Sequence, residues 1–421
     1  MDWYNGFGIK PDLDQWISLD TLLQVIGEGN ANVIVAICNP PRNSKTVVLR
    51  LAKESGINLK PLPFSVADQQ AYQICATLSL FGQPFLPEMS LVSTTPALLS
   101  KIAASIMSQR NSIRTYKNID ILQKSVMIME NTMIGSNDGR SRSFAIEIKP
   151  KWGFRPPEAN GQLCRFCMHQ IIKSKQDGSN ISKYCPLLLF SRNKDNIKTA
   201  IQSLLQTPQN NLKLFDNGMS VEFDQYYSTL KKCFGSSDAF IELIAQTLFD
   251  SSLLESLKDY QSAFHASPAT VQDIIRQLSD DDKCTIDALL IEHCNEILKP
   301  TRNIPSCSIT SIPFIFPSPI GETSNSKLNQ LTTNQMRLIF RFLISMTLKD
   351  ASIVLVFEAN NSDGTMEFDR MRLIDLDPKS IHSISKWLKL QKEIDEVSNH
   401  IKEGRSCFGA SRIDDTQRIS N

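Results

Sequence analysis

Two lysines separated by a proline follow a short apolar segment of the sequence. Residues 143–154 read SFAIEIKPKWGF, and the part before Lys149 has the pattern of a buried strand. Pro150 cannot donate a hydrogen bond to a sheet, so we expect the strand to end there and Lys149 and Lys151 to project from the same face. Strand ends commonly contact ligands, and two neighbouring ammonium groups suit phosphate. The alternative interpretation is a solvated strand exit.

Two aspartates stand at the edges of two further apolar segments. Asp350 precedes the run ASIVLVFEA, and Asp375 ends the run MRLID. Carboxylates brought to one end of adjacent strands can divide the work of phosphoryl transfer, because one can accept a hydroxyl proton while the other binds Mg²⁺ against ATP oxygens. The alternative is that Asp350 caps a turn and that Asp375 is a solvated strand end.

A glycine-containing turn joins two apolar runs near the N-terminus. Gly27 and Gly29, in VIGEGNANVIVAI, allow a hairpin backbone to approach phosphates closely and to bind their oxygens through N–H groups. Alone, this pattern is more typical of an ordinary hairpin turn. The next apolar run, KTVVLRLAK, contains Arg50 as a lone cation, where a kinase-like fold places its phosphate-pairing residue. Together the two features favour a nucleotide site.

A predicted helix over RFCMHQIIKSK carries two further donors. His169 and Lys173 are four residues apart and therefore lie on one helix face, where both can reach the same phosphate. The segment TPQNNLKLFDNG adds two amides and a lysine, which can bind anions or simply shape a turn.

The same helix contains Cys164-x-x-Cys167, a spacing that occurs in zinc sites. Such sites need four ligands, and no second pair of cysteines or histidines stands at a usable spacing in the sequence. We therefore expect no metal at these two cysteines.

The elements that must position these residues divide the chain into two parts. Residues 1–134 are β-rich, the loop 135–143 forms a boundary, residues 135–405 are mainly helical with a small sheet, and residues 406–421 form a disordered tail. The expected class is α+β, without internal repeats. We expect helices over residues 165–175, 193–206, 236–260, 270–299 and 334–350 and from about residue 383.

Composition restricts the partners and the compartment. The formal net charge of +1 gives no sign of a nucleic-acid or membrane partner, so an anion site must be a local cluster of cations. The longest apolar runs are far below the roughly 20 residues that span a bilayer, and the N-terminus does not resemble a signal peptide. Ten scattered cysteines indicate reduced thiols. We expect a monomer in the cytoplasm or nucleus, without an obligate protein partner.

Read together, these segments resemble the inositol-pentakisphosphate 2-kinase family. Residues 147–151, EIKPK, followed by Trp-Gly-Phe, are similar to the E-x-K-P-K signature of that family. The segments RFCMHQ, SKYCPL, PQNNLK, LKDASI and LIDLDPK resemble its further conserved blocks, and GEGNAN resembles its glycine loop. These blocks extend from residue 27 to residue 379, which is most of the chain.

The resemblance implies a two-lobed, protein-kinase-like fold with a β-rich N-terminal lobe and a larger, mainly helical C-terminal lobe. It implies a kinase that transfers the γ-phosphate of ATP, with Mg²⁺, to the 2-hydroxyl of inositol 1,3,4,5,6-pentakisphosphate. The product would be inositol hexakisphosphate (phytate).

The resemblance also assigns roles to residues. Asp350 takes the position of the catalytic base, assisted by Lys149 and Lys151, and Asp375 takes the position of the Mg²⁺ ligand. The expected ATP contacts are Gly27, Glu28, Gly29, Asn30, Asn32, Arg50, Glu130, Asn131 and Glu147. The expected inositol-phosphate contacts are Arg110, Arg114, Lys149, Lys151, His169, Lys173, Asn210, Asn211, Lys213 and Lys379.

Two departures from the family pattern concern substrate contacts. Trp152 stands where many members carry cysteine, and the segment after Lys379, SIHSISKW, lacks the basic residue and the tyrosine of some members. Some relatives hold a structural zinc in an insertion, but the cysteines and histidines between residues 265 and 307 do not match its spacing. We therefore expect no structural zinc.

Two other functions stay open at this point. Another inositol polyphosphate kinase would use a similar set of cations, although the P-x-x-x-D-x-K-x-G signature of the multikinase type is absent from the sequence. A non-catalytic scaffold that binds inositol phosphates would not need Arg50, Asp350 and Asp375, which are all present.

Overall fold

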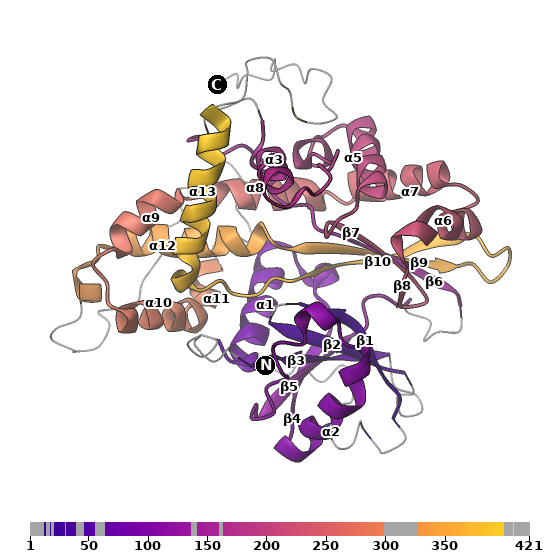
Figure 1. Ribbon diagram of the computed structural model, residues 1–421, viewed down its shortest axis with the longest axis horizontal. Helices are drawn as coiled ribbons and strands as arrows, with labels where there is room; N and C mark the ends of the chain where they lie inside the picture. Colours follow the sequence, from indigo (N-terminus) through magenta and orange to yellow (C-terminus); the bar gives the residue numbers. More distant parts are fainter. Residues whose placement is uncertain are drawn as a thin grey trace.

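The computed structural model contains two five-stranded sheets and a set of helices (Figure 1). It describes residues 12–13, 17, 21–29, 31–38, 46–54, 64–135, 141–159, 163–298, 327–399 and 407. All neighbouring strands within both sheets are antiparallel. The described residues therefore confirm the expected α+β class.

The first sheet has the strand order β1-β2-β3-β5-β4. Its strands are β1 (Leu23–Glu28), β2 (Asn32–Ile37), β3 (Val47–Ala52), β4 (Met89–Ser93) and β5 (Ser125–Glu130). These bounds confirm the predicted hairpin and the predicted strand around Arg50. In Figure 1 the sheet lies in the lower part of the molecule.

Two helices within the first part of the chain are absent from the sequence prediction. They are α1 (Val66–Leu80) and α2 (Pro96–Ile106). Both have identifiable starts, because the Ser65 side chain accepts a hydrogen bond from the Asp68 backbone in a capping box and Thr95 caps α2. These capping residues were the local signal that could have revealed the helices.

The second sheet has the strand order β10-β9-β6-β7-β8. Its strands are β6 (Ser143–Ile148), β7 (Leu212–Asp216), β8 (Met219–Ser220), β9 (Ser352–Ala359) and β10 (Met366–Ile374). β6 is the middle strand, and all six of its residues are buried. Because each neighbour runs antiparallel, the end of β6, the start of β9 and the end of β10 lie at the same edge.

The remaining helices surround the second sheet. They are α3 (Arg165–Asp177), α4 (Pro186–Leu189), α5 (Lys194–Gln206), α6 (Tyr226–Phe234), α7 (Ser237–Asp250), α8 (Leu253–Ala263), α9 (Pro268–Ile275), α10 (Asp280–Glu292), α11 (Cys294–Leu298), α12 (Thr333–Leu348) and α13 (Ile384–Asn399). None of the described helices has the length and apolarity that a membrane crossing requires.

Two of the helices expected from the sequence are shorter than predicted. The segment 236–260 divides into α7 and α8 at Ser252, whose φ of 51° is left-handed and ends a right-handed helix. The segment 270–299 divides into α9, α10 and α11, because Ser279 begins a new capping box. Apolar periodicity continues across both breaks and therefore does not show them.

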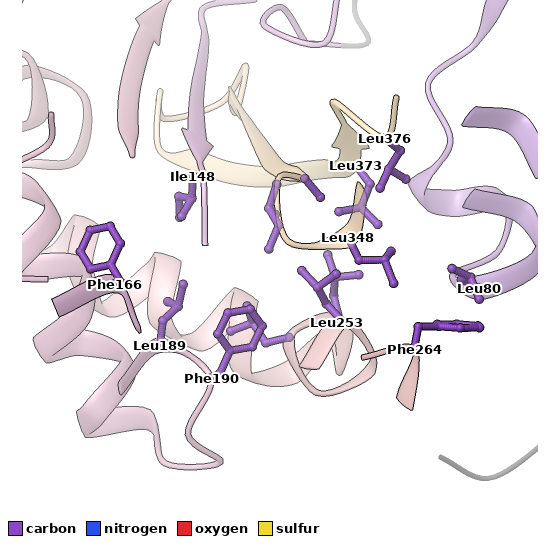
Figure 2. Packing of buried hydrophobic residues seen from close by; sticks show 14 of the residues in the cluster. Leu80, Ile148, Phe166, Leu189, Phe190, Leu253, Phe264, Leu348, Leu373 and Leu376 are labelled. Carbon is purple, nitrogen blue, oxygen red and sulfur yellow. The ribbon is translucent and has the colours of Figure 1, made fainter. Parts of the chain in front are cut away.

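The largest hydrophobic core joins the second sheet to these helices and to α1. Figure 2 shows Leu348 of α12, Leu373 of β10 and Leu376 in its interior, with Leu80 of α1 at its margin. A separate apolar cluster lies within the first sheet and α2. Helix α1 thus belongs to the first part of the sequence but packs into the core of the second part.

Ion pairs also connect the two sheets. The Glu130 carboxylate, at the end of β5, lies 2.7 Å from Arg370 Nε and 3.1 Å from Arg372 Nε, and both arginines are on β10. Arg50 of β3 binds Asp377, which lies just beyond β10. The end of β10 is therefore fixed against the first sheet at two places.

The segment after β6 is fastened to the helices by one buried glutamine. Gln261 of α8 accepts a hydrogen bond from the Gly153 amide at 2.8 Å and donates to the carbonyl oxygens of Lys151 and Leu348, at 2.9 and 3.0 Å. Gly153 itself has no room for a side chain, since an added Cβ would lie 2.6 Å from the Phe190 ring. This contact determines where the chain runs immediately after the two lysines.

Replacement of this glutamine tests its role. Gln261→Met should lower the free energy of unfolding by about 2–4 kcal/mol, because one amide and two carbonyl groups lose a buried partner. Urea unfolding measures the loss, and the exposed Gln202→Met is the matched control. Equal stability of the two variants would contradict this role for Gln261.

Candidate active site

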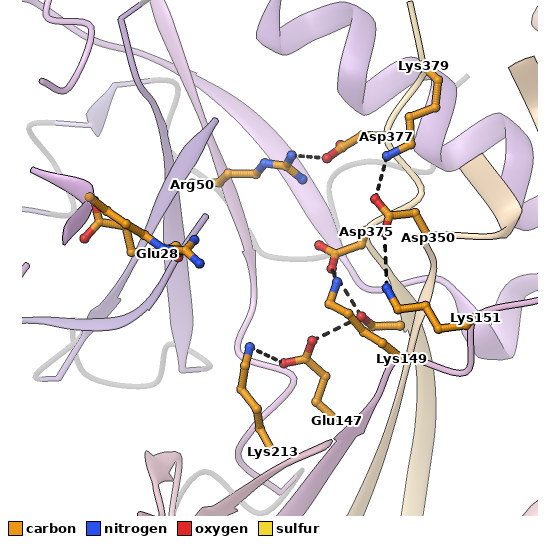
Figure 3. A network of polar contacts seen from close by, with 12 residues as sticks. Glu28, Arg50, Glu147, Lys149, Lys151, Lys213, Asp350, Asp375, Asp377 and Lys379 are labelled. Carbon is orange, nitrogen blue, oxygen red and sulfur yellow. Dashed lines mark hydrogen bonds and ion pairs between the residues drawn. The ribbon is translucent and has the colours of Figure 1, made fainter. Parts of the chain in front are cut away.

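Lysines and carboxylates form one cluster at the shared edge of β6, β9 and β10 (Figure 3). Lys149 forms a hydrogen-bonded ion pair with Asp375. Lys151 Nζ lies 3.7 Å from one oxygen of Asp350, and Lys379 Nζ lies 2.8 Å from the other. The structure therefore brings together five residues that the sequence analysis selected from three separate segments.

Two residues of this cluster have an unusual backbone conformation. Lys151 and Asp375 both have a φ of 63°, in the left-handed region that residues with a side chain rarely adopt. Such conformations cost about 1–3 kcal/mol each and are concentrated at functional sites. The left-handed φ of Lys151 shows that the alternation of a regular strand does not continue to this residue. Lys149 and Lys151 nevertheless line the same cavity, and each contacts a different aspartate.

The charges of the cluster keep both aspartates ionised. Burial would raise the pKa of Asp375, but the charge of Lys149 and its hydrogen bond, with Arg50, lower it to about 2. Burial opposes ionisation of Asp350 as well, and Lys379 and Lys151 lower its pKa. The pKa of Lys151 is lowered, chiefly by burial, against the attraction of Asp350. The site thus contains two ionised carboxylates, which can accept hydrogen bonds, beside a lysine whose pKa is lowered.

Arg50 enters this region from the first sheet. Its guanidinium lies 2.5 Å from Asp377, whose other oxygen accepts a hydrogen bond from Gln73 of α1 at 2.6 Å. Asp377 was not predicted from the sequence, although its spacing of two residues from Asp375 in the segment LIDLDPK was an available signal. Asp377 fixes the arginine at the edge of the cluster.

Glu147 has its partner on the neighbouring strand. It lies directly opposite Lys213 of β7, and the Lys213 Nζ donates to its carboxylate at 2.9 Å. Ser352 of β9 donates to the other carboxylate oxygen at 3.1 Å. This cross-strand pair explains how a glutamate is accommodated in the buried middle strand.

The glycine turn is a tight hairpin. Gly27 lies in β1 at a shift in register with β2, and the Gly29 amide donates to the Asn32 carbonyl at 2.9 Å. Asn32 begins β2, opposite Ala52 of β3. Asn30, the other asparagine predicted to contact nucleotide, lies outside the described residues.

Buried ion pairs hold this hairpin in place through Glu28. Its carboxylate lies 2.7 Å from Arg110 Nη2 and 2.5 Å from Lys53 Nζ, and all three side chains are almost fully buried. Arg114 donates to the Glu28 carbonyl at 2.5 Å. Arg110, which we predicted to bind inositol phosphate, thus has its guanidinium against Glu28, and its phosphate contact stays a prediction.

A cavity of about 640 Å³ lies between the glycine hairpin and the second sheet. Most of the residues predicted to contact nucleotide line it, together with several predicted phosphate contacts. From the predicted sets, its walls contain Gly27, Glu28, Gly29, Arg50, Arg114, Glu130, Asn131, Glu147, Lys149, Lys151, Asn210, Lys213, Asp350 and Asp375.

A second cavity of about 740 Å³ lies among α3, α12 and α13. From the predicted set, Lys151, His169, Lys173, Asn210, Asn211, Asp350 and Lys379 line it. Its wall contains three further cations that were not predicted from the sequence, Arg165, Lys349 and Lys386. Six lysine and arginine side chains and two carboxylates line this cavity, so its wall carries an excess of positive charge that suits an anionic ligand.

An aromatic side chain supports two of these added cations. The Trp152 ring has Lys349 Nζ 3.8 Å and the Arg165 guanidinium 4.7 Å from its centre. These are cation–π distances. Burial, together with Arg165, lowers the pKa of Lys349 well below its usual range. The tryptophan that departs from the family pattern therefore positions two cations of the cavity wall.

The two cavities share a wall. Lys151, Asn210 and Asp350 line both of them. A group bound in one cavity and a group bound in the other would therefore meet at Asp350, with Lys151 beside them. This arrangement suits the transfer of a group from one bound molecule to another.

The acidic residues of the first cavity suit a hard divalent cation. The Asp375 side chain is 41% exposed, and one of its oxygens accepts a hydrogen bond from Lys149 and lies 3.2 Å from the Ser352 hydroxyl. The other carboxylate oxygen of Asp375 is a ligand of the type that Mg²⁺ prefers. Asp375 therefore fits the predicted position of a Mg²⁺ ligand, whereas both oxygens of Asp377 already bind Arg50 and Gln73.

Two further cysteines lie beside Cys164 and Cys167, although the sequence contains no second pair at a usable spacing. Cys185 and Cys407 lie beside them, and the four sulfur atoms are all within 4.8 Å of one another. The spacing rule failed because one partner comes from about 20 residues and the other from about 240 residues further along the chain.

Comparisons with known proteins agree on one family. A sequence model described as inositol-pentakisphosphate 2-kinase matches residues 26–393. The inositol-pentakisphosphate 2-kinase of Oryza sativa subsp. japonica is 29% identical over 308 residues, which cover 64% of this chain and 63% of that protein. The chain thus spans less than two thirds of the rice relative. The protein of the same name from Arabidopsis thaliana is 24% identical over 375 residues, 77% of this chain and 76% of the relative.

A fungal relative aligns over more of its length. The inositol-pentakisphosphate 2-kinase of Cryptococcus neoformans is 25% identical over 405 residues, which cover 88% of this chain and 91% of that protein.

The cations of the second cavity predict a pH dependence. Burial and the charges of Lys173, Arg165 and Lys151 lower the pKa of His169 to about 4. The unfolded chain should hold a proton on this histidine below about pH 6.5. In the folded chain His169 stays unprotonated until the pH approaches 4. The free energy of unfolding should therefore fall as the pH drops from about 6.5 towards 4.

The measurement is the urea midpoint across this pH range. His169→Gln should show a smaller loss of stability on acidification than the wild type. Part of the loss should remain, because burial and Lys349 lower the pKa of His265 to about 4 as well. The control is His382→Gln, since His382 lies beside the carboxylate of Asp280. Identical profiles of urea midpoint against pH for wild type and His169→Gln would show that the cations do not lower the pKa of His169.

Proposed function

The chain belongs to the inositol-pentakisphosphate 2-kinase family, and on that premise we propose that it is an ATP-dependent kinase of inositol 1,3,4,5,6-pentakisphosphate. The reaction transfers the γ-phosphoryl group to the 2-hydroxyl and gives inositol hexakisphosphate. The observation that carries the proposal is the wall shared by the two cavities. It offers one place, beside Asp350 and Lys151, where a nucleotide and an anionic acceptor would meet.

We assign the nucleotide to the cavity of about 640 Å³. The glycine hairpin can bind phosphate oxygens through its amides, and Arg50, held by Asp377, offers a cation. Adenine is assigned to the segment at Glu130 and Asn131. The Glu130 carboxylate is occupied by Arg370 and Arg372, so recognition of the base would use the backbone of this segment.

We assign the inositol polyphosphate to the cavity of about 740 Å³. Five phosphates carry a charge of roughly −8 to −10 at neutral pH. The chain as a whole has a net charge of +1, so only a local set of cations can compensate such a ligand. The six lysine and arginine side chains of this cavity supply that set.

The residues between the cavities account for the chemistry. Asp350 accepts the proton of the 2-hydroxyl as its oxygen forms a bond to the γ-phosphorus. The bond from that phosphorus to the β,γ-bridging oxygen breaks, and ADP leaves. Lys149 and Lys151 compensate the charge of the transferred group, which is the main contribution a protein makes to phosphoryl transfer.

Asp375 is assigned to Mg²⁺ because its carboxylate stands in the nucleotide cavity. The ion, when bound, neutralises charge on the phosphate oxygens. Lys149, which pairs with Asp375, would then be released towards the phosphates. The strained backbone of Asp375 supports an active-site role.

The same proposal includes the two-lobed arrangement of protein kinases. The first sheet with α2 would form the N-terminal lobe (1–134), and residues 135–405 would form the C-terminal lobe. The cavity between the glycine hairpin and the second sheet supports this division. Helix α1 is an exception to this division, because it precedes residue 135 in the sequence but packs into the hydrophobic core of the second part.

The role of Asp375 is tested by a variant of the same shape. Asp375→Asn should lower the turnover number about a hundredfold or more, because charge compensation at the transferred group is lost. Affinity for the pentakisphosphate should change little, since Asp375 does not line the second cavity. Asp363→Asn, in the exposed turn between β9 and β10, is the control. Near-normal turnover of Asp375→Asn at saturating Mg²⁺ would refute the assignment.

The proposed reaction is tested with substrates that differ by one phosphate. Turnover of the 1,3,4,5,6-pentakisphosphate should exceed that of tetrakisphosphates lacking one of these groups, because remote phosphates help to set the catalytic geometry. The product should be the hexakisphosphate, identified by chromatography and ³¹P NMR. Equal turnover numbers, or a phosphate at any other position, would overturn the proposal, and binding without turnover would favour a scaffold.

A further inference from the structure

One of the six cations in the wall of the second cavity is a buried lysine. Lys349 follows α12 and immediately precedes Asp350, and only 4% of its surface is exposed. Its Nζ lies 3.8 Å from the centre of the Trp152 ring and 5.3 Å from the centre of the Phe154 ring. The end of this side chain therefore lies against aromatic rings at the edge of the cavity, away from bulk water.

The polar partner of Lys349 is a histidine and not a carboxylate. Lys349 Nζ donates to Nδ1 of His265 at 3.0 Å, and Nε2 of the same ring lies 2.8 Å from the Glu158 carboxylate. A neutral ring that accepts at Nδ1 has its proton at Nε2 and donates it to Glu158. Burial and Lys349 lower the pKa of His265 to about 4, which agrees with a neutral ring. The lysine thus reaches a carboxylate only through the imidazole.

Two other lysines of this cavity contact a carboxylate directly. Lys151 and Lys379 both form ion pairs with Asp350. Among the residues that the structure describes, no carboxylate forms an ion pair with Lys349 itself. A buried ammonium group without a direct counter-charge is costly, and burial of this kind favours loss of the proton.

Cations from three helices surround the lysine and the histidine. Arg165 of α3 lies over the same tryptophan ring as Lys349, and Lys386 of α13 lines the same cavity. The charge of Arg341, on α12, opposes protonation of His265. This part of the cavity wall therefore lacks negative charge before a ligand binds.

The surroundings of Lys349 determine which form of the side chain is favoured. Burial and the charge of Arg165 lower the pKa of Lys349 well below its usual range, and Glu158 opposes this effect. A polyanion in the cavity would supply the missing counter-charge and so favour the protonated lysine.

We propose that binding of the inositol polyphosphate is coupled to the uptake of one proton by Lys349, and that His265 and Glu158 stabilise the ammonium group that results. The proton comes from solvent and stays on Nζ while the ligand is bound. This inference rests on the proposed function, because it takes the cavity of about 740 Å³ as the site of the acceptor. It follows that affinity for the acceptor falls as the pH rises, since the complex needs a charge that the free chain loses.

Calorimetric titration with inositol hexakisphosphate, in two buffers of different ionisation enthalpy, measures this proton uptake. At about pH 8 the wild type should take up at least about half a proton more per bound ligand than Lys349→Met. Methionine retains the apolar contacts with the two aromatic rings and removes the amine. Lys101→Met, at an exposed lysine of α2, should behave as the wild type does. Equal proton uptake by the wild type and Lys349→Met would overturn the proposal.

The affinities of the two proteins for the same ligand should also converge as the pH rises. At about pH 6.5 Lys349→Met should bind the hexakisphosphate about tenfold or more weakly than the wild type, because one charge-assisted interaction is lost. The difference should decrease towards about pH 9, where Lys349 of the free wild type is neutral. The affinity for Mg·ADP should not change, since Lys349 does not line the first cavity. A difference that stays constant with pH would show a permanently charged lysine and refute proton uptake.

Glu158→Gln keeps the test valid if Lys349→Met does not fold. The Glu158 side chain is 43% exposed, and glutamine can still accept the hydrogen bond from His265. Because the charge that favours a proton on Lys349 is lost, the fall in affinity should move to lower pH. An unchanged pH profile would contradict the proposal. A wild type that binds no inositol polyphosphate would refute the proposed function, whereas binding with equal proton uptake in all variants would refute this inference alone.

Discussion

Cations that are close enough to bind one polyanion repel one another unless carboxylates stand between them. The active site meets this constraint by alternation, since Arg50 faces Asp377, Lys149 faces Asp375, and Asp350 lies between Lys151 and Lys379. The three aspartates are drawn from only two segments of the chain. The sheet order must therefore place the start of β9 and the end of β10 beside the end of β6. The antiparallel order β10-β9-β6 does so, and the two cavities open on either side of the resulting row of charges.

The middle strand of the second sheet shows how such a row is anchored. β6 is buried throughout, and its one charged residue, Glu147, forms an ion pair with Lys213 and accepts a hydrogen bond from Ser352, on the strands on both sides. Beyond the strand, Gln261 binds the backbone on both sides of Trp152. The two lysines between these anchor points therefore have a backbone fixed at both ends. Precise placement of this kind is what phosphoryl transfer requires from a protein.

The sequence allowed prediction of those features that depend on local pattern. The alternation and apolarity of β6, β9 and β10 identified three of the five strands of the second sheet, and with them Lys149, Asp350 and Asp375. Features that depend on distant segments were missed. Cys407 and Arg165 become neighbours of their partners only through folding, and α1 packs into a core that is formed mostly by later residues. Short elements such as β4 and β8 carry too few residues for a periodic signal.

The positive φ of Lys151 and Asp375 has a consequence for the history of this chain. Glycine would relieve the backbone at either position, but it would also remove the ion pairs of Lys151 with Asp350 and of Asp375 with Lys149. Selection for their chemistry accounts for a lysine and an aspartate where the backbone conformation favours glycine. In a gene copy released from that selection, these two codons would be free to change to glycine or asparagine, which suit the left-handed backbone. The two positions therefore record, in any descendant of this chain, whether its catalytic function is still being selected.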